Sequence, residues 1–235
     1  MSKIEMNVSP DVKRAMISFK TAMNKKYGEG SDIFSNGQYQ DFESISSGSA
    51  ILDGLLGNGG WVRGRIHEIF GASGSGKSTI VSLTCANARR QYPDKYILYV
   101  DSEQGQSFSY MRKLGLDCEN DEGVVFLQMQ EAENVFEVID GAVATGAFSL
   151  VVVDSVPALM TKRELNGDYD KETMAEKARF LSKALPKLLE SLKKANTTLI
   201  FVNQVRDKMD MWGGVTTPGK YIYSYYLVTL DFCRS

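Results

Sequence analysis

The sequence lacks the cysteine pattern of a disulfide-stapled or zinc-binding protein. Its 235 residues include three cysteines, Cys85, Cys118 and Cys233, which stand far apart. A zinc site or a disulfide framework needs paired cysteines, and a zinc site needs them at short spacing. We therefore expect reduced thiols and a cytoplasmic protein.

Long apolar runs and an excess of charge are also missing. No apolar stretch approaches the roughly 20 residues that span a bilayer, and residues 1–9 have no apolar signal core. We expect no membrane partner. Because 27 basic and 29 acidic residues give a net charge of −2, any nucleic-acid site must be local.

From Gly64 onward, short apolar runs alternate with segments of helical periodicity. The expected strands are 65–70, 96–100, 124–129, 150–153, 198–202 and 226–232, and the expected helices are 77–91, 107–114, 132–145 and 172–195. This rhythm predicts an α/β fold with a mostly parallel central sheet flanked by helices. Pro186 should kink or split the last helix.

A separate helix is expected before this region. Ser9 suits an N-cap and Pro10 a first helical position. The helix should end before Gly28, and its apolar stripe consists of Val12, Met16, Phe19 and Met23. Two hypotheses stay open, since the stripe suits packing either on a neighbouring subunit or on its own domain. We expect an amino-terminal segment at 1–33 and a core at 34–235.

One segment has the spacing of a phosphate-binding loop. It reads Gly71-Ala72-Ser73-Gly74-Ser75-Gly76-Lys77-Ser78 and lies directly between an expected strand and an expected helix. Its glycines let backbone N–H groups face phosphate oxygens, beside the positive end of the helix. Lys77 would reach the β and γ phosphates, and the Ser78 hydroxyl would ligate Mg²⁺. The alternative is a flexible Gly/Ser linker.

Three more strands are followed by polar side chains. Asp154 suits the magnesium-holding acid of a nucleotide triphosphatase or a helix cap. Glu103 suits a general base that activates water or a solvated loop acid. Gln204 suits a γ-phosphate contact or a plain turn. All three should lie at the carboxyl edge of the sheet, where open parallel sheets bind ligands.

These motifs, in this order, resemble those of the RecA family of recombinases. The similarity continues through residues 45–49, 52–53, 64–66, 110–115, 151–159 and 199–206, and covers about 12 to 232. The resemblance implies a P-loop fold of the RecA type, ATP and Mg²⁺ as cofactors, and an ATPase core without the family's carboxyl-terminal domain.

The resemblance also implies roles for individual residues. Tyr110 would stack on adenine, and Asp154 and Ser155 would form the magnesium-side pair. Gln204 would link the γ phosphate to a DNA-binding loop. The implied catalytic residues are Glu103, Lys77 and Gln204, and the implied nucleotide site includes Thr79 next to the phosphate loop.

DNA would meet two loops, at about 160–173 and 206–221. Gly-rich backbone, basic side chains and one large ring suit phosphate contacts and base stacking; without the resemblance these would be ordinary surface loops. The implied DNA-binding residues are Lys162, Arg163, Arg179, Arg206, Lys208, Trp212, Gly213, Gly214, Thr216, Thr217 and Lys220.

The implied function is homologous recombination and DNA repair by a filament on single-stranded DNA that engages duplex DNA during strand exchange. The amino-terminal helix and residues 26–30 resemble the family's polymerisation element, and a head-to-tail contact that does not close gives a helical polymer.

The sequence departs from the family pattern at three places. Pro218 stands where the family usually has glycine, and Pro186 interrupts a helix that runs straight in the family. The sequence also ends at Ser235, before strands whose two lysines reach a neighbour's ATP, and this departure supports an alternative. We therefore expect impaired turnover, or a weakly catalytic or non-catalytic protein that binds ATP and modulates a full-length recombinase. A third hypothesis, a helicase-like or clock-like hexamer, fits residues 110–115 and the amino terminus less well.

Overall fold

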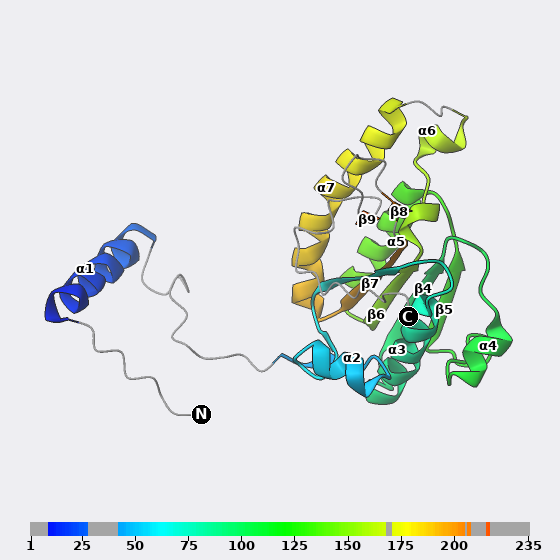
Figure 1. Ribbon diagram of the computed structural model, residues 1–235, viewed down its shortest axis with the longest axis horizontal. Helices are drawn as coiled ribbons and strands as arrows, with labels where there is room; N and C mark the ends of the chain where they lie inside the picture. The colour runs from blue at the N-terminus through cyan, green and yellow to red at the C-terminus, as the bar shows by residue number, and fades with distance from the viewer. Residues whose placement is uncertain (1–8, 28–41, 168–170, 205, 208–214, 217–235) are drawn as a thin grey trace. The chain divides into compact units, whose positions relative to one another are not determined.

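The computed structural model describes residues 9–27, 42–167, 171–204, 206–207 and 215–216. Its contacts divide the chain into two units, Met1–Asp41 and Phe42–Ser235 (Figure 1). The described residues of the first unit form one helix, α1 (Pro10–Tyr27), which begins and ends where the sequence predicts. The Ser9 hydroxyl caps it by accepting from the backbone N–H of Val12 at 3.5 Å. Within the described ranges, no helix is long and apolar enough to cross a membrane.

The second unit is built on a five-stranded sheet. Its strands are β3 (Ile66–Gly71), β4 (Tyr96–Asp101), β5 (Val124–Gln128), β6 (Phe148–Asp154) and β7 (Thr198–Gln204). They lie in the order β3-β7-β6-β4-β5, and every neighbouring pair is parallel. The predicted parallel sheet is therefore confirmed. The strand expected at 226–232 lies outside the described residues.

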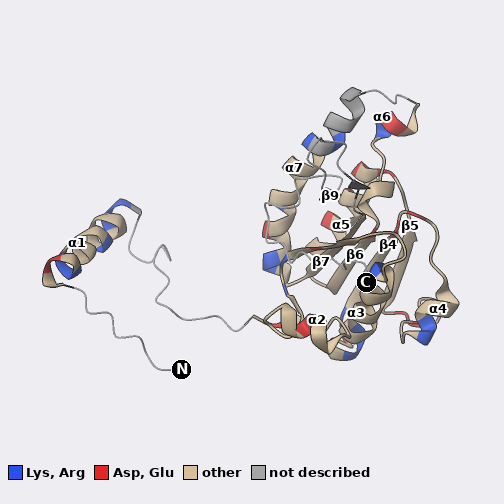
Figure 2. Ribbon diagram, viewed as in Figure 1, with Lys and Arg blue, Asp and Glu red and all other residues tan. Residues whose placement is uncertain are grey.

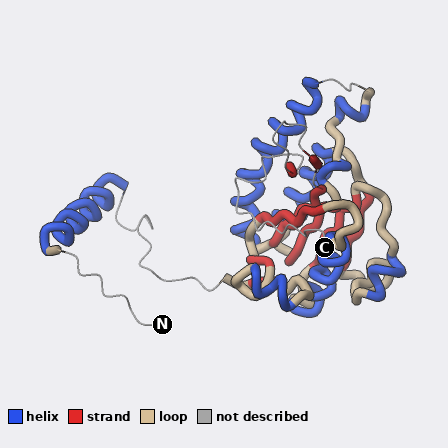
Figure 3. The backbone as a smooth tube through the Cα atoms, viewed as in Figure 1, coloured by secondary structure: helices blue, strands red, loops and turns tan. Residues whose placement is uncertain are grey.

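Helices cover both faces of this sheet (Figure 3). The helices are α2 (Ala50–Leu55), α3 (Lys77–Gln91), α4 (Phe108–Lys113), α5 (Ala132–Ala144), α6 (Lys162–Leu165) and α7 (Lys171–Ala195), with a 3₁₀ turn at Val156–Ala158. Two short antiparallel pairs join β1 (Ser44–Ile45) to β2 (Trp61–Val62) and β8 (Arg206–Asp207) to β9 (Val215–Thr216).

The prediction that Pro186 could split the last helix is wrong, because α7 runs without interruption through it. Proline removes the hydrogen bond to the carbonyl four residues earlier, at Ser182. Pro186 lies on the exposed side of α7. The carbonyl can therefore find water there, and buried leucines on the opposite side hold the helix to the sheet.

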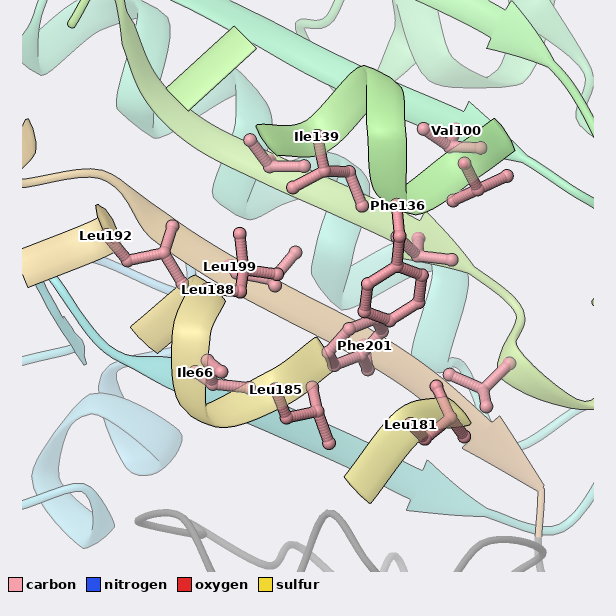
Figure 4. Close-up of a cluster of buried hydrophobic side chains, with 14 of the residues drawn as sticks. Ile66, Val100, Phe136, Ile139, Leu181, Leu185, Leu188, Leu192, Leu199 and Phe201 are labelled. Atoms are coloured by element: carbon pink, nitrogen blue, oxygen red, sulfur yellow. The ribbon is translucent and has the colours of Figure 1, made fainter. Parts of the chain in front are cut away.

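The core has two halves because successive side chains of a strand point to opposite faces. On one face, α5 and α7 pack against β3, β6 and β7, as Figure 4 shows for Phe136, Leu185 and Phe201. On the other face, α3 packs against the alternate residues of the same strands, among them Ile200 and Val202.

Charged side chains gather on the helices and at strand ends, while the strands themselves carry few (Figure 2). A sheet covered on both faces must be apolar along its length. The buried histidine and acids of the strands are His67, Glu68, Asp101 and Asp154. Asp101 and Asp154 are the last residues of β4 and β6 and lie at the carboxyl edge.

His67 is a buried structural histidine. Its Nε2 lies 2.8 Å from the carbonyl oxygen of Val62, and its ring meets the edge of Trp61 at a centroid distance of 5.4 Å. Burial, which penalises the charged form, lowers the pKa of His67 from 6.5 to about 4, aided by the nearby charge of Arg65 and opposed by the Val62 contact.

Replacing Ile139 by alanine should lower the free energy of unfolding by about 2–5 kcal/mol, because the change leaves a cavity in the α5–α7 half of the core. Ile139 is fully buried, whereas Ile51 on α2 is 79% exposed. Ile51→Ala is the matched control and should change stability by less than about 0.5 kcal/mol. Urea unfolding measures both, and equal losses would contradict this core.

His67 is the only histidine in the chain, so one NMR titration of its ring protons reports its pKa directly. We expect a value of about 4 in the folded protein and one near 6.5 in urea. Between these values only the unfolded chain binds the proton. Because of His67, the free energy of unfolding should therefore be about 3 kcal/mol higher above pH 6.5 than near pH 4, and this difference is lost as the pH falls through that range. A folded-state pKa near 6.5 would contradict its burial.

Candidate functional site

The parallel register brings the polar strand ends to one edge of the sheet. Gly71 at the end of β3 is aligned with Gln204 at the end of β7. Asp101 at the end of β4 is aligned with Asp154 at the end of β6. The phosphate-binding loop predicted from sequence leaves β3 at this same edge and enters α3.

The loop has the backbone that its glycines suggest. Gly74 and Gly76 have φ values of 74° and 89°, in the left-handed region that a side chain rarely adopts. Gly76 directly precedes the first residue of α3, so the amino-terminal end of that helix faces the loop.

Residues 74–79 line a cavity of about 230 Å³. The buried Ser75 hydroxyl has no hydrogen-bond partner within the described part of the chain. These features suit a bound anion such as a phosphate group.

Lys77 lies across the loop. Its Nζ donates to the carbonyl oxygens of Gly71 at 3.1 Å and Ala72 at 2.7 Å. Burial lowers the pKa of Lys77, while the negative charges of Asp154 and Glu103 raise it. The ammonium is therefore held among acceptors, with little water around it.

Asp154 accepts hydrogen bonds from three side chains of the site. Its Oδ2 accepts from the Tyr99 hydroxyl at 2.8 Å and from Gln106 Nε2 at 2.9 Å, and its side chain is also hydrogen-bonded to Ser78. Burial raises the pKa of Asp154, and the bonds from Ser78 and Tyr99 oppose that change. Sequence reasoning missed Tyr99 and Gln106, since neither belongs to a motif.

The pairing of Ser78 with Asp154 fits Mg²⁺ bound together with a phosphate. Among the described residues, no group of three or more histidine, cysteine or acidic side chains could hold a metal ion. Mg²⁺ normally needs no such cage, because it binds one or two carboxylates and completes its shell with waters and substrate phosphates. A hydroxyl and a carboxylate oxygen are suitable ligands for that arrangement.

Hydrogen bonds to Glu103, which follows β4, link it to the ends of β6 and β7. Its Oε1 accepts from Gln204 Nε2 at 3.1 Å and from the Ser155 hydroxyl. The structure thus brings Glu103, Ser155 and Gln204 together, as expected for strand ends at one edge.

Asp101, which the sequence did not single out, fixes the turn that carries Glu103. Asp101 is fully buried. Its carboxylate oxygens accept from the backbone N–H groups of Glu103 at 3.1 Å, Gln104 at 2.8 Å and Gln106 at 3.3 Å. Several hydrogen bonds to one carboxylate hold a loop in one conformation.

Tyr110 on α4 reaches the start of α3. Its hydroxyl lies 3.1 Å from Thr79 Oγ1, and 48% of the residue is exposed. An exposed ring beside the phosphate loop is placed where a nucleotide base could stack on it.

The candidate DNA-binding residues are described only in part. Lys162 and Arg163, expected in a loop, lie in the short helix α6, where Lys162 Nζ is 3.2 Å from Glu131 Oε1. Arg179 is exposed on α7. Arg206 and Thr216 belong to the backbone pair of β8 and β9. The candidates outside the described residues are Lys208, Trp212, Gly213, Gly214, Thr217 and Lys220.

A glycine-rich loop between a strand and a helix, with a buried acid at the end of a second strand of a parallel sheet, defines a P-loop nucleotide-binding protein. Residues 14–235 match the family model of the RecA N-terminal domain. The chain therefore belongs to the RecA family, and its sheet, flanking helices and amino-terminal helix agree with an ATPase core of the RecA type. Family membership supports ATP binding and a recombinase-like function in general terms.

Asp101→Asn should lower the free energy of unfolding by about 1–3 kcal/mol, because an amide N–H₂ would then face backbone N–H donors inside the protein. Asp117→Asn is the matched control, since Asp117 accepts from the N–H groups of Glu119 and Asn120 in an exposed turn. We expect a smaller loss there. Thermal unfolding compares them, and an equal loss at both positions would contradict the role of burial.

Proposed function

We propose that this chain is an ATP-dependent recombination and DNA repair protein that polymerises on single-stranded DNA, hydrolyses ATP and promotes strand pairing and exchange with duplex DNA. The observation that carries the proposal is the contact between Glu103 and Gln204 at the edge that holds the phosphate loop. One hydrogen bond there joins a candidate catalytic acid to Gln204, which stands two residues before the start of β8.

Nucleotide binding rests on the segment from Gly71 to Ser78 and on Thr79. Backbone N–H groups of the loop and the Lys77 ammonium would hold the phosphates. Ser78 and Asp154 would hold Mg²⁺, which when bound neutralises charge on the phosphate oxygens. Tyr110, beside Thr79, would stack on the adenine ring.

Hydrolysis rests on Glu103. Its carboxylate would orient an attacking water and take a proton from it, as a general base does. The donors from Ser155 and Gln204 hold one oxygen of this carboxylate in place. Lys77 and the loop N–H groups would stabilise the charge that develops on the phosphates.

Coupling to DNA rests on Gln204. It ends β7, and β8 begins two residues later at Arg206. We propose that the Gln204 amide turns from Glu103 toward the γ phosphate, and that the backbone of residues 204–206 passes this change to the start of the β8–β9 segment. The basic side chains proposed to meet DNA phosphates are Lys162, Arg163, Arg179, Arg206, Lys208 and Lys220, and the other proposed contacts are Trp212, Gly213, Gly214, Thr216 and Thr217.

Assembly is proposed to be head-to-tail. Residues 1–33 would dock on the next subunit, and residues 34–235 would form the ATPase core. The amphipathic sequence of α1 supports docking, because its apolar residues recur at helical spacing. A contact of this kind extends into a filament. Two of the three cysteines, Cys85 and Cys118, are free thiols, which supports a cytoplasmic location.

The test is ATP hydrolysis with and without single-stranded DNA, in the wild type and in Glu103→Gln. We expect DNA to stimulate the wild type, and the variant to lose about 10²–10⁴-fold in kcat, as removal of a general base does. The Kd for ATP should change by less than about 2-fold, because the phosphate loop is intact. Glu122→Gln, at an exposed acid, is the matched control and should behave as the wild type.

The outcomes separate the hypotheses. ATP binding without DNA-stimulated hydrolysis, and with no loss in Glu103→Gln, would overturn the enzyme and leave a non-catalytic modulator of another recombinase. Electron micrographs with ATP and DNA should contain filaments, whereas rings would favour a hexameric motor.

A further inference from the structure

Glu68 is a buried acid that the phosphate site does not use. It lies in β3, three residues before Gly71, and is fully buried. Its Oε1 accepts from Asn203 Nδ2 at 2.5 Å. Its Oε2 has no hydrogen-bond partner among the residues that the structure describes. Burial raises the pKa of Glu68, and the bond from Asn203 opposes that change. Burying an acid lowers the stability of the fold unless hydrogen bonds replace those lost to water. The hydrogen bond from Asn203 therefore indicates where the role of Glu68 should be sought.

Asn203 connects this acid to the candidate switch. The Asn203 Oδ1 accepts from the backbone N–H of Gln204 at 2.9 Å. Asn203 is fully buried between β3 and β6 in the sheet, next to the end of β7. Its side chain therefore bridges a strand that carries the phosphate loop and the backbone of the residue that contacts Glu103.

The acid also selects the orientation of the amide. A side-chain amide has one end that donates and one that accepts. Because Glu68 accepts a hydrogen bond from the NH₂ group, the Asn203 oxygen is the end that faces the Gln204 N–H. The connection is then continuous from Glu68 through Asn203 and Gln204 to Glu103.

We propose that Glu68 is a positioning residue, which orients the Asn203 amide and through it holds the backbone of Gln204 beside Glu103. This inference rests on the proposed role of Gln204 in coupling ATP to DNA. Glu68 is not among the residues that line the phosphate-loop cavity, and its hydrogen bond within the described residues goes to Asn203, so we expect it to act through Asn203.

The experiment compares Glu68→Leu, Glu68→Gln, Asn203→Leu and the double variant Glu68→Leu/Asn203→Leu. Leucine keeps the volume and removes the connection, whereas glutamine still offers an oxygen to Asn203 Nδ2. Thr84→Val is the control for stability. It removes a buried hydrogen bond, from Trp61 Nε1 to Thr84 Oγ1 at 3.0 Å, that has no link to Gln204.

The first readout is amide hydrogen exchange at Gln204 by NMR, in the full chain without nucleotide. We expect exchange to be at least about 10-fold faster in Glu68→Leu and in Asn203→Leu than in the wild type. The double variant should exchange no faster than Asn203→Leu, because both changes break the same connection from Glu68 through Asn203 to Gln204. Glu68→Gln and Thr84→Val should stay within about 2-fold of the wild type.

The second readout is the factor by which single-stranded DNA stimulates ATP hydrolysis. We expect Glu68→Leu to reduce this factor at least about 10-fold with the Kd for ATP within about 2-fold, and Glu68→Gln to restore it. If single-stranded DNA does not stimulate the wild type, the proposed function fails, and the exchange measurement still decides whether Glu68 positions Gln204.

The positioning role of Glu68 would be overturned by unchanged exchange at Gln204 in Glu68→Leu, or by equal effects of Glu68→Leu and Thr84→Val.

Discussion

The parallel pairing of β3, β7, β6 and β4 is the constraint on which the rest of the structure depends. Parallel strands all end at the same edge, so a polar residue placed after each apolar run meets the others in space. Gly71, Gln204, Asp154 and Asp101 are brought together in this way, although they are far apart in sequence. Helices must cover both faces of such a sheet, which confines charge to the helices and the strand ends.

The site balances several buried polar groups against one another. Lys77 is held near Asp154 and Glu103, whose charges favour its ammonium form, while burial disfavours it. The bonds from Tyr99 and Ser78 favour the charged form of Asp154, which burial disfavours. Each of these groups is costly alone. A phosphate would add negative charge beside Lys77 and a magnesium ion would add positive charge beside Asp154, so both ligands suit the charges already in place.

Local patterns explain most of what the sequence could predict. The phosphate loop is contiguous, so its spacing and flanks define it, and the helix α3 begins and ends where the periodicity indicates. Asp154 and Gln204 could be found because each ends an apolar run, and Glu103 because it follows one closely.

The connection from Glu68 to Asn203 could not be found, since these residues stand 135 positions apart and meet only through the register of β3 with β7. Tyr99 was missed because its partner Asp154 lies on another strand, whereas the partners of Asp101 lie in the turn that directly follows it. The expected split of α7 was wrong because Pro186 lies on its exposed side.

A crystal structure with Mg²⁺ and a non-hydrolysable ATP analogue tests the central claim most directly. We expect the β and γ phosphates inside the loop of residues 71–78, with Lys77 Nζ moved from the carbonyl oxygens of Gly71 and Ala72 to phosphate oxygens. We also expect Mg²⁺ on the Ser78 hydroxyl near Asp154, and the Gln204 amide turned from Glu103 toward the γ phosphate. A nucleotide bound elsewhere, or one bound here with Lys77 and Gln204 unmoved, would contradict this claim.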